Sequence, residues 1–169
     1  GTNLMIVRKA ALKRLTDPKA EPVVCGTKEG EETWMGMGLW GREFLGWNIR
    51  WIPGYAGSSD FALAFQRGEI DMMGTSNAYL IKQYSDDGHV VLVTQMGSFG
   101  IDHKFIRRPD FPNVPTFVET LGKKKPTGVA WQAYEAFVAA NMIDKFMVAP
   151  RRTPKKYVSM LTDAYSKMS

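Results

Sequence analysis

The segment GYAGSSDFALAFQRGEID, residues 54–71, decides the fold because it joins a turn, a helix and the start of a strand. Ser58-Ser59-Asp60 offers residues that are preferred at helix N-caps. The apolar residues from Phe61 to Phe65 follow at helical spacing, and Gly68 ends the helix. Ile70 to Met73 is then a short apolar run typical of a buried strand. A turn, helix and strand in this order form the repeating unit of an α/β protein.

The same alternation continues on both sides of this segment. Short apolar runs predict four further strands, at residues 4–7, 22–26, 48–52 and 90–93. Amphipathic stretches predict further helices at residues 10–15, 31–45 and 78–84. Because short turns and helical crossovers link these strands, the sequence predicts an α/β fold with a doubly wound, mostly parallel sheet.

The later part of the chain has a different character. Residues 108–116 contain three prolines, so we expect neither a helix nor a central strand there. The pattern after them predicts helices over residues 117–121 and 129–141 and a strand over residues 146–149. A last helix is predicted to start at residue 153, with a proline in the first turn, where proline is favoured. We expect a lobe boundary between residues 95 and 130, and divide the chain into residues 1–97 and 98–169.

Composition excludes several classes of protein. The 169 residues are 44% hydrophobic and 23% charged, which is typical of a globular domain. The net charge is +5 and the pI about 9.3, but the basic residues are scattered and do not alternate with aromatic residues, which argues against nucleic-acid binding. The single cysteine excludes an internal disulfide framework and a CxxC metal site. No run is long enough to predict a membrane span, and no secretory leader is recognisable.

Two motifs allow an enzymatic interpretation, and we favour it for neither. Gly36-Met37-Gly38-Leu39-Trp40-Gly41 matches GxGxxG, but the preceding strand ends about ten residues earlier, whereas a dinucleotide motif follows its strand directly. The glycines are more typical of close helix packing. Cys25 ends a buried-type strand and is expected to behave as a small hydrophobe, and His89 and His103 lie beside turn residues. We therefore expect no catalysis, no cofactor and no metal site.

Three turns that follow predicted strands are rich in glycine and hydroxyl residues. In open α/β sheets, ligands bind beyond the carboxyl ends of the strands, where loops and helix N-termini present free N–H groups. An alternative is that Thr27 and Ser58 only cap helices, although capping and ligand contact are compatible. The predicted substrate-binding residues are Thr27, Lys28, Gly30, Glu31, Tyr55, Gly57, Ser58, Thr75, Ser76 and Asn77.

Residues 54–71 resemble the GYKGSSDxxLALERGEIDG stretch of the solute receptors of tripartite tricarboxylate transporters, also called Bug proteins. Three more stretches agree in the same order along the chain. Residues 4–9 resemble the family's mfVR strand, residues 108–116 resemble its rhPdlPdVPT loop, and residues 148–164 resemble its vAPPGtPxxxvxxLrxA segment. The RGEID and PdlPdVPT elements are specific when they occur together.

The resemblance implies a periplasmic-binding-protein-like fold of type II, with two α/β lobes hinged around a cleft. It implies a periplasmic receptor that captures a small organic ligand, often a carboxylate, and delivers it to a membrane permease. The family is longer, so residues 4 to about 95 would form its second lobe and the remainder the returning part of the first. Two departures concern the ligand: Gly30-Glu31-Glu32-Thr33 places carboxylates after the second strand, and Arg151-Arg152 replaces the usual Pro-Gly. The alternatives are an α/β enzyme using GxGxxG or Cys25, and a truncated receptor that binds protein.

Overall fold

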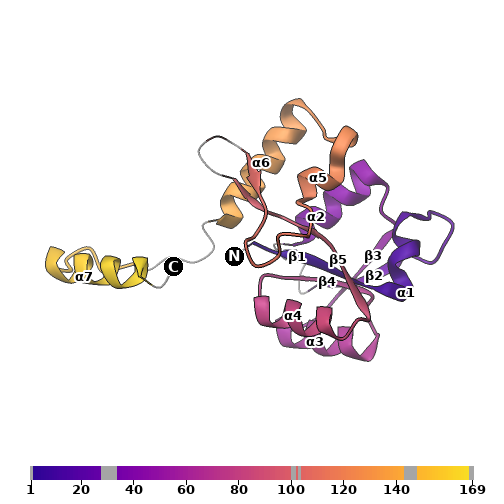
Figure 1. The fold of residues 1–169 in the computed structure, drawn as a ribbon, viewed down its shortest axis with the longest axis horizontal. Helices are drawn as coiled ribbons and strands as arrows, with labels where there is room; N and C mark the ends of the chain where they lie inside the picture. Colours follow the sequence, from indigo (N-terminus) through magenta and orange to yellow (C-terminus); the bar gives the residue numbers. More distant parts are fainter. Residues whose placement is uncertain (1, 28–33, 100–101, 103, 143–147, 168–169) are drawn as a thin grey trace.

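A five-stranded sheet forms the centre of the structure, which is a computed structural model describing residues 2–27, 34–99, 102, 104–142 and 148–167. The strand order is β3-β2-β4-β1-β5, and helices cover both faces (Figure 1). The α/β fold predicted from the sequence is therefore confirmed. The strands are β1 (Leu4–Arg8), β2 (Val23–Thr27), β3 (Ile49–Pro53), β4 (Met72–Thr75) and β5 (Val90–Gln95).

The sheet is mixed, although four of its strands run in one direction. β2 pairs in parallel with β3 and β4, whereas β1 is antiparallel to both of its neighbours, β4 and β5. The register places Leu4 opposite Thr75 on one side and Gln95 on the other. The apolar run that predicted β1 is buried on both faces, so its pattern carries no information about strand direction.

Two helices cover one face of the sheet. They are α3 (Ser58–Arg67) and α4 (Ala78–Asp86), which lie together below the sheet in Figure 1. Phe61 and Phe65 of α3 and Ile81 of α4 pack with Leu4 and Ile6 of β1 in one hydrophobic cluster. Gly68 ends α3 in the left-handed conformation, with φ of 77°, as the sequence predicts for a terminal glycine.

The opposite face carries α1 (Lys9–Leu12), a 3₁₀ turn (Lys13–Thr16), α2 (Met35–Trp40) with a π-helical turn (Gly41–Leu45), α5 (Phe117–Leu121), a second 3₁₀ turn (Gly122–Lys124) and α6 (Gly128–Met142). Phe117 and Tyr134 are fully buried there, with Tyr134 packed against Trp40 of α2 and Phe117 packed against Tyr134 and Trp47. Thr116 begins α5 with a complete capping box that includes Glu119. Residues 117–142 therefore share a core with β1 and β2, and the division at residue 97 stays a prediction.

The three glycines of the GxGxxG motif serve close packing. A Cβ atom added at Gly36 would collide with the ring of Phe137, and one added at Gly41 would collide with the ring of Trp47. At Gly38 it would lie 2.8 Å from Trp51. The helix begins at Met35, eight positions after β2 ends at Thr27, and it does not follow that strand directly. The packing interpretation of this motif is confirmed.

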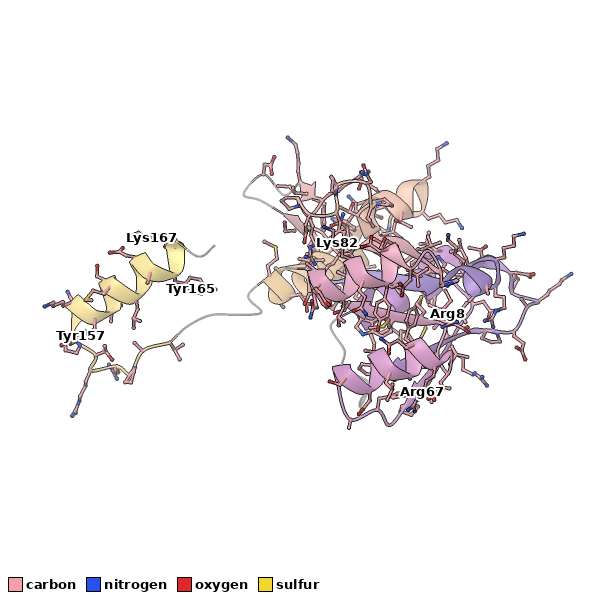
Figure 2. All side chains as sticks on the ribbon, turned by 60° about the horizontal axis from the view of Figure 1, so that its bottom comes forward. Arg8, Arg67, Lys82, Tyr157, Tyr165 and Lys167 are labelled. Atoms are coloured by element: carbon pink, nitrogen blue, oxygen red, sulfur yellow. The ribbon has the colours of Figure 1, made fainter. Side chains whose placement is uncertain are left out.

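The end of the chain departs from the prediction in two places. A hairpin of β6 (Ser98–Phe99) and β7 (Phe105–Ile106) was not predicted. The strand predicted over residues 146–149 lies partly outside the described residues, and Val148 and Ala149 are not in a strand. The last helix, α7 (Lys155–Ser166), buries none of its side chains and stands apart from the sheet, with Tyr157 and Tyr165 on its surface (Figure 2). No helix within the described ranges is long and apolar enough to cross a membrane.

Candidate ligand-binding site

The three predicted turns follow three neighbouring parallel strands. β2 lies between β3 and β4, Thr27 is paired with Pro53, and Cys25 is paired with Met72. The carboxyl ends of these strands therefore meet at one edge of the sheet, which we call the carboxyl edge. Because β1 is antiparallel, its first residue, Leu4, arrives at the same edge beside Thr75. The structure thus brings together the described members of the predicted site.

The first two turns are joined by a backbone contact. Thr27 ends β2 with a buried side chain, and its carbonyl oxygen accepts a hydrogen bond from the Tyr55 N–H at 3.4 Å. The ring of Tyr55 packs 5.3 Å from that of Phe61 and covers Gly26, where an added Cβ atom would lie 2.8 Å from the tyrosine ring. The other predicted residues of the first turn, Lys28, Gly30 and Glu31, lie outside the described residues.

The second turn begins α3 differently from the prediction. Gly57 is the N-cap residue, and its carbonyl oxygen accepts hydrogen bonds from the N–H groups of Asp60 and Phe61 at 3.1 and 3.2 Å. Ser58 is already the first helical residue, so the expectation that it caps the helix is wrong. The Asp60 carboxylate accepts a hydrogen bond from the Ala56 N–H at 3.1 Å and stabilises the turn from inside the helix. A glycine at the N-cap offers no side chain, which leaves the helix terminus sterically open.

The third turn is held by its own side chains. The Thr75 hydroxyl accepts a hydrogen bond from the Asn77 N–H at 3.1 Å. The Asn77 side-chain oxygen accepts from the N–H groups of Tyr79 and Leu80 at 3.0 and 3.3 Å, and so caps α4. Thr75 and Asn77 therefore have structural hydrogen bonds within the turn, in addition to any contact that they make with a ligand.

Arg108 supports the third turn and was not predicted as part of the site. Its Nη1 donates to the carbonyl oxygens of Ser76 at 3.0 Å and Thr2 at 2.8 Å, and so joins the loop before α4 to the residues before β1. The guanidinium is paired with Asp110 and lies 5.1 Å from the Phe111 ring centre. The hydrogen bond from Arg108 lowers the pKa of Asp110. The arginine and aspartate spaced by one proline are the only sequence signal for this pair.

Gln95 completes this support from the end of β5. It is fully buried, and its amide nitrogen donates to the carbonyl oxygens of Phe111 at 3.1 Å and Val114 at 2.6 Å. Its side-chain oxygen accepts a hydrogen bond from the Arg108 N–H at 2.8 Å. Because Gln95 is buried and all of these hydrogen bonds are formed, it fixes the path of the proline-rich loop. Nearby, the Thr2 hydroxyl is buried without a hydrogen-bond partner among the described residues.

Cysteine or metal chemistry finds no support in the described geometry. Cys25 is fully buried, and burial raises the pKa of its thiol well above the usual value, with a further contribution from Asp71. The thiolate form is therefore disfavoured. Within the part of the chain that is described, no three side chains from histidine, cysteine, aspartate and glutamate gather in a metal-binding arrangement. His89 is exposed, and His103 lies outside the described residues.

The carboxyl edge thus presents hydroxyl, amide and backbone groups, and the charges of Arg108 and Asp60 both have partners. Such groups can hold a polar ligand by hydrogen bonds.

Solved structures with a similar fold exist, whereas no family model and no curated protein matches the sequence. A periplasmic transporter aligns with 96% of this chain and 49% of its own, with a TM-score of 0.59 and 18% identity. A TctC solute-binding protein from Polaromonas, solved without ligand, aligns with 85% of this chain and 52% of its own, with a TM-score of 0.54 and 19% identity. The chain spans about half the length of these structures. The fold of the chain is therefore similar to that of these two structures, as the resemblance implied.

Proposed function

We propose that this chain is part of an extracytoplasmic solute receptor that captures a small organic ligand at the carboxyl edge. The single observation that carries the proposal is the convergence of three turns beyond neighbouring parallel strands, in a fold similar to that of a TctC solute-binding protein. Ligands of open α/β sheets bind in this position. The resemblance of residues 54–71 to the receptors of tripartite tricarboxylate transporters supports the same role from the sequence.

The ligand that we propose is a small carboxylate. Turn N–H groups and helix N-termini attract anions, and the second and third turns each open a helix at this edge. The N-cap of α3 is Gly57, where an added Cβ atom would meet nothing within 4 Å. A ligand can therefore approach the backbone of this turn closely. The neutral hydroxyl groups of the three turns would set the orientation of the ligand.

The partner that we propose is the membrane permease of a tripartite tricarboxylate-type transporter, reached from the periplasm. One of the similar structures is a periplasmic transporter, which supports this location. A second lobe would close over the carboxyl edge and exclude water from the ligand. Affinity would then come from hydrogen bonds already in place, without a chemical step.

A thermal-shift screen of the chain against small carboxylates, amino acids and neutral vitamins tests the proposal. A ligand that binds only the folded state adds about 2.7 kcal/mol of stability at 100 times its dissociation constant. We expect this increase with carboxylates. An absence of any shift with the carboxylates would contradict the proposal.

A variant at the second turn locates the site. Gly57 has an extended φ of 174° and open surroundings, so Gly57→Leu keeps the fold and blocks the approach to the turn. We expect it to abolish the carboxylate-induced shift. The matched control is Lys82→Leu on the exposed surface of α4, which adds the same side chain away from the edge. Equal binding of the carboxylate by both variants would show that the ligand does not bind at the carboxyl edge.

A further inference from the structure

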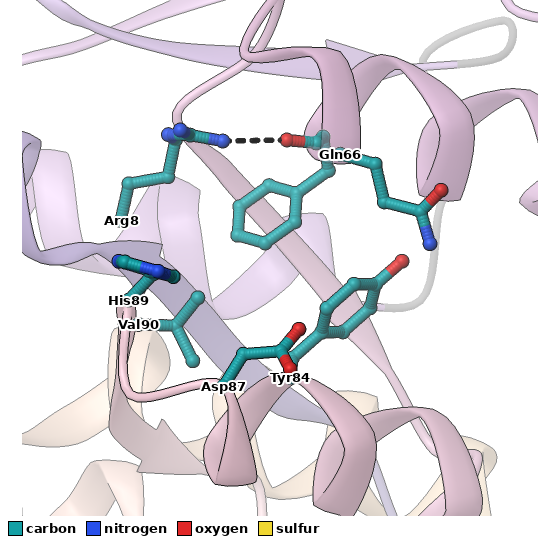
Figure 3. Close-up of a pocket in the computed structure, with 7 residues that line it drawn as sticks. Arg8, Gln66, Tyr84, Asp87, His89 and Val90 are labelled. Atoms are coloured by element: carbon teal, nitrogen blue, oxygen red, sulfur yellow. Dashed lines mark hydrogen bonds between the residues drawn. The ribbon is translucent and has the colours of Figure 1, made fainter.

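A pocket of about 160 Å³ lies at the opposite edge of the sheet from the predicted site (Figure 3). Arg8, the last residue of β1, is paired with Val90, the first residue of β5, and both line it. Phe65 of α3 and Tyr84 of α4 form its apolar wall, with their rings 5.3 Å apart in an edge-to-face arrangement. Gln66, Asp87 and His89 complete the lining. We call this the Arg8 pocket.

Arg8 contributes a positive charge to the pocket, and only part of the hydrogen-bonding capacity of its guanidinium is used within the protein. Its Nη1 donates to the Phe65 carbonyl oxygen at 2.7 Å, and its guanidinium carbon lies 5.9 Å from the centre of the Phe65 ring. Arginine has five N–H donors, and among the described residues no carboxylate lies within 4.0 Å to pair with it. A partly buried guanidinium with unused donors is a site for a carboxylate.

Asp87 brings the opposite charge to the other side of the pocket. It is the C-cap residue of α4, so its carboxylate adds to the negative end of the helix dipole. It is exposed, and no cation pairs with it in the described part of the chain. Burial raises the pKa of Tyr84, and the charge of Asp87 adds to this effect. The aspartate charge therefore acts on the wall of the pocket and favours a cationic group there.

We propose that the Arg8 pocket binds a small zwitterion of the α-amino-acid type, with its carboxylate at Arg8 and its ammonium group at Asp87. Phe65, Tyr84 and Val90 would contact a short apolar side chain. The volume of about 160 Å³ leaves room for a small molecule such as alanine. A simple anion would meet Asp87, and a simple cation would meet Arg8. The two opposed charges thus favour a ligand that carries both.

Three ligands of matched shape test the charge requirement in the unmodified chain by NMR titration. L-Alanine carries both charges, isobutyrate lacks the ammonium group, and alaninamide lacks the carboxylate. A hydrogen bond to a charged group contributes about 1.5–3 kcal/mol, so we expect alaninamide to bind at least roughly tenfold more weakly. Isobutyrate should bind about threefold more weakly, because the Asp87 contact is exposed. Equal affinity for alanine and isobutyrate would overturn the proposal.

Variants assign each charge to its residue. Asp87→Asn should weaken alanine about threefold and leave isobutyrate unchanged. Arg8→Gln should weaken both by roughly tenfold. Because Arg8 also caps the end of α3, Asp87→Asn provides the decisive comparison if Arg8→Gln does not fold. Asp163→Asn on α7 is the matched control and should change nothing.

The position of the alanine-induced signals separates this proposal from the proposed function. They should appear at residues 87–90 and persist in Gly57→Leu, which blocks the carboxyl edge. Signals confined to residues 75–77, and lost in Gly57→Leu, would place the amino acid at the receptor site and overturn the Arg8 pocket. Failure of the carboxylate screen would leave the alanine result unaffected, since the two sites lie at opposite edges of the sheet.

Discussion

The two edges of the sheet use polar groups in opposite ways. At the carboxyl edge, Arg108 is paired with Asp110, and Thr75 and Asn77 hydrogen-bond to the backbone of their own turn. In the Arg8 pocket, Arg8 and Asp87 carry opposite charges with no ion-pair partner among the described residues. At the carboxyl edge the charged groups therefore stabilise the structure and neutral groups are left for a ligand. In the pocket, the charged groups of Arg8 and Asp87 are available to a ligand.

This difference predicts different responses to mutation. The groups of the carboxyl edge are interlocked, so a change there affects stability together with binding. In the pocket, Arg8 also bonds the end of α3, whereas Asp87 is exposed and has no ion-pair partner among the described residues, so removal of the Asp87 charge affects binding first. Substitutions in and around the carboxyl edge test this interlocking, and the largest effect is expected from the most tightly packed position.

Gly74→Val should cause the largest loss of stability. Gly74 lies in β4 directly under Trp34, and an added Cβ atom would collide with the indole ring. Trp34 is itself buried and packs 5.5 Å from Trp51, so it has little room to move. Overpacking of this kind typically costs 1–3 kcal/mol, and we expect about 3 kcal/mol in urea unfolding.

The matched glycine is Gly57, whose surroundings are open and whose φ is extended. Gly57→Ala should change the free energy of unfolding by less than about 0.5 kcal/mol. Equal losses in the two variants would mean that the contact with Trp34 is not what restricts position 74.

Much of the fold was predictable because local patterns decide it. The apolar spacing and Gly68 predicted α3, and the helix over residues 117–121 was predicted with the bounds of α5. The direction of β1 was not predictable, because a strand buried on both faces has the same pattern in either direction. The hairpin of β6 and β7 was missed because strands of two residues leave no periodicity.

The site was predictable only in part. The turns after β3 and β4 were found because glycine and hydroxyl residues mark strand ends, and Asn77 indeed lies at the start of α4. Arg108 and Gln95 were missed, because their partners at Ser76 and Val114 are carbonyl oxygens, which any residue would supply. The Arg8 pocket was missed because it combines two helix ends with two strands, a contact that no local pattern encodes.

Arg108→Met should have an intermediate effect. It removes the hydrogen bonds to the carbonyl oxygens of Thr2 and Ser76 and leaves Asp110 without its cation. Since hydrogen bonds to charged groups contribute about 1.5–3 kcal/mol, we expect a loss of about 2 kcal/mol. Hydrogen exchange should also become faster at residues 76–80, because the third turn loses its support.

Arg50→Met, on the exposed surface of β3, removes an arginine that no ion pair holds among the described residues. It should leave both the stability and the exchange rates unchanged. Faster exchange spread evenly over the chain in Arg108→Met would indicate a general loss of stability without a specific role at the third turn.

The smallest effect is expected from Glu119, which lies below the proline-rich loop. Arg107 donates to both of its carboxylate oxygens, at 2.9 and 2.7 Å, and the Thr116 N–H and hydroxyl add two more hydrogen bonds. These contacts lower the pKa of Glu119 to about 2, with Arg107 as the largest cause. The stabilisation is therefore complete above the unfolded-state pKa, about 4.3, and is lost as the pH falls towards 2.

The Glu119 side chain is 46% exposed, so solvent screening limits the stabilisation to less than about 1 kcal/mol. Urea unfolding of the wild type and of Glu119→Gln, from pH 6 to pH 2, measures it. The difference in the free energy of unfolding should be constant above about pH 5 and shrink as the pH falls, because the glutamine variant lacks the titrating group. A difference that stays constant down to pH 2 would show that the capping hydrogen bonds, and not the charge held by Arg107, account for the role of Glu119.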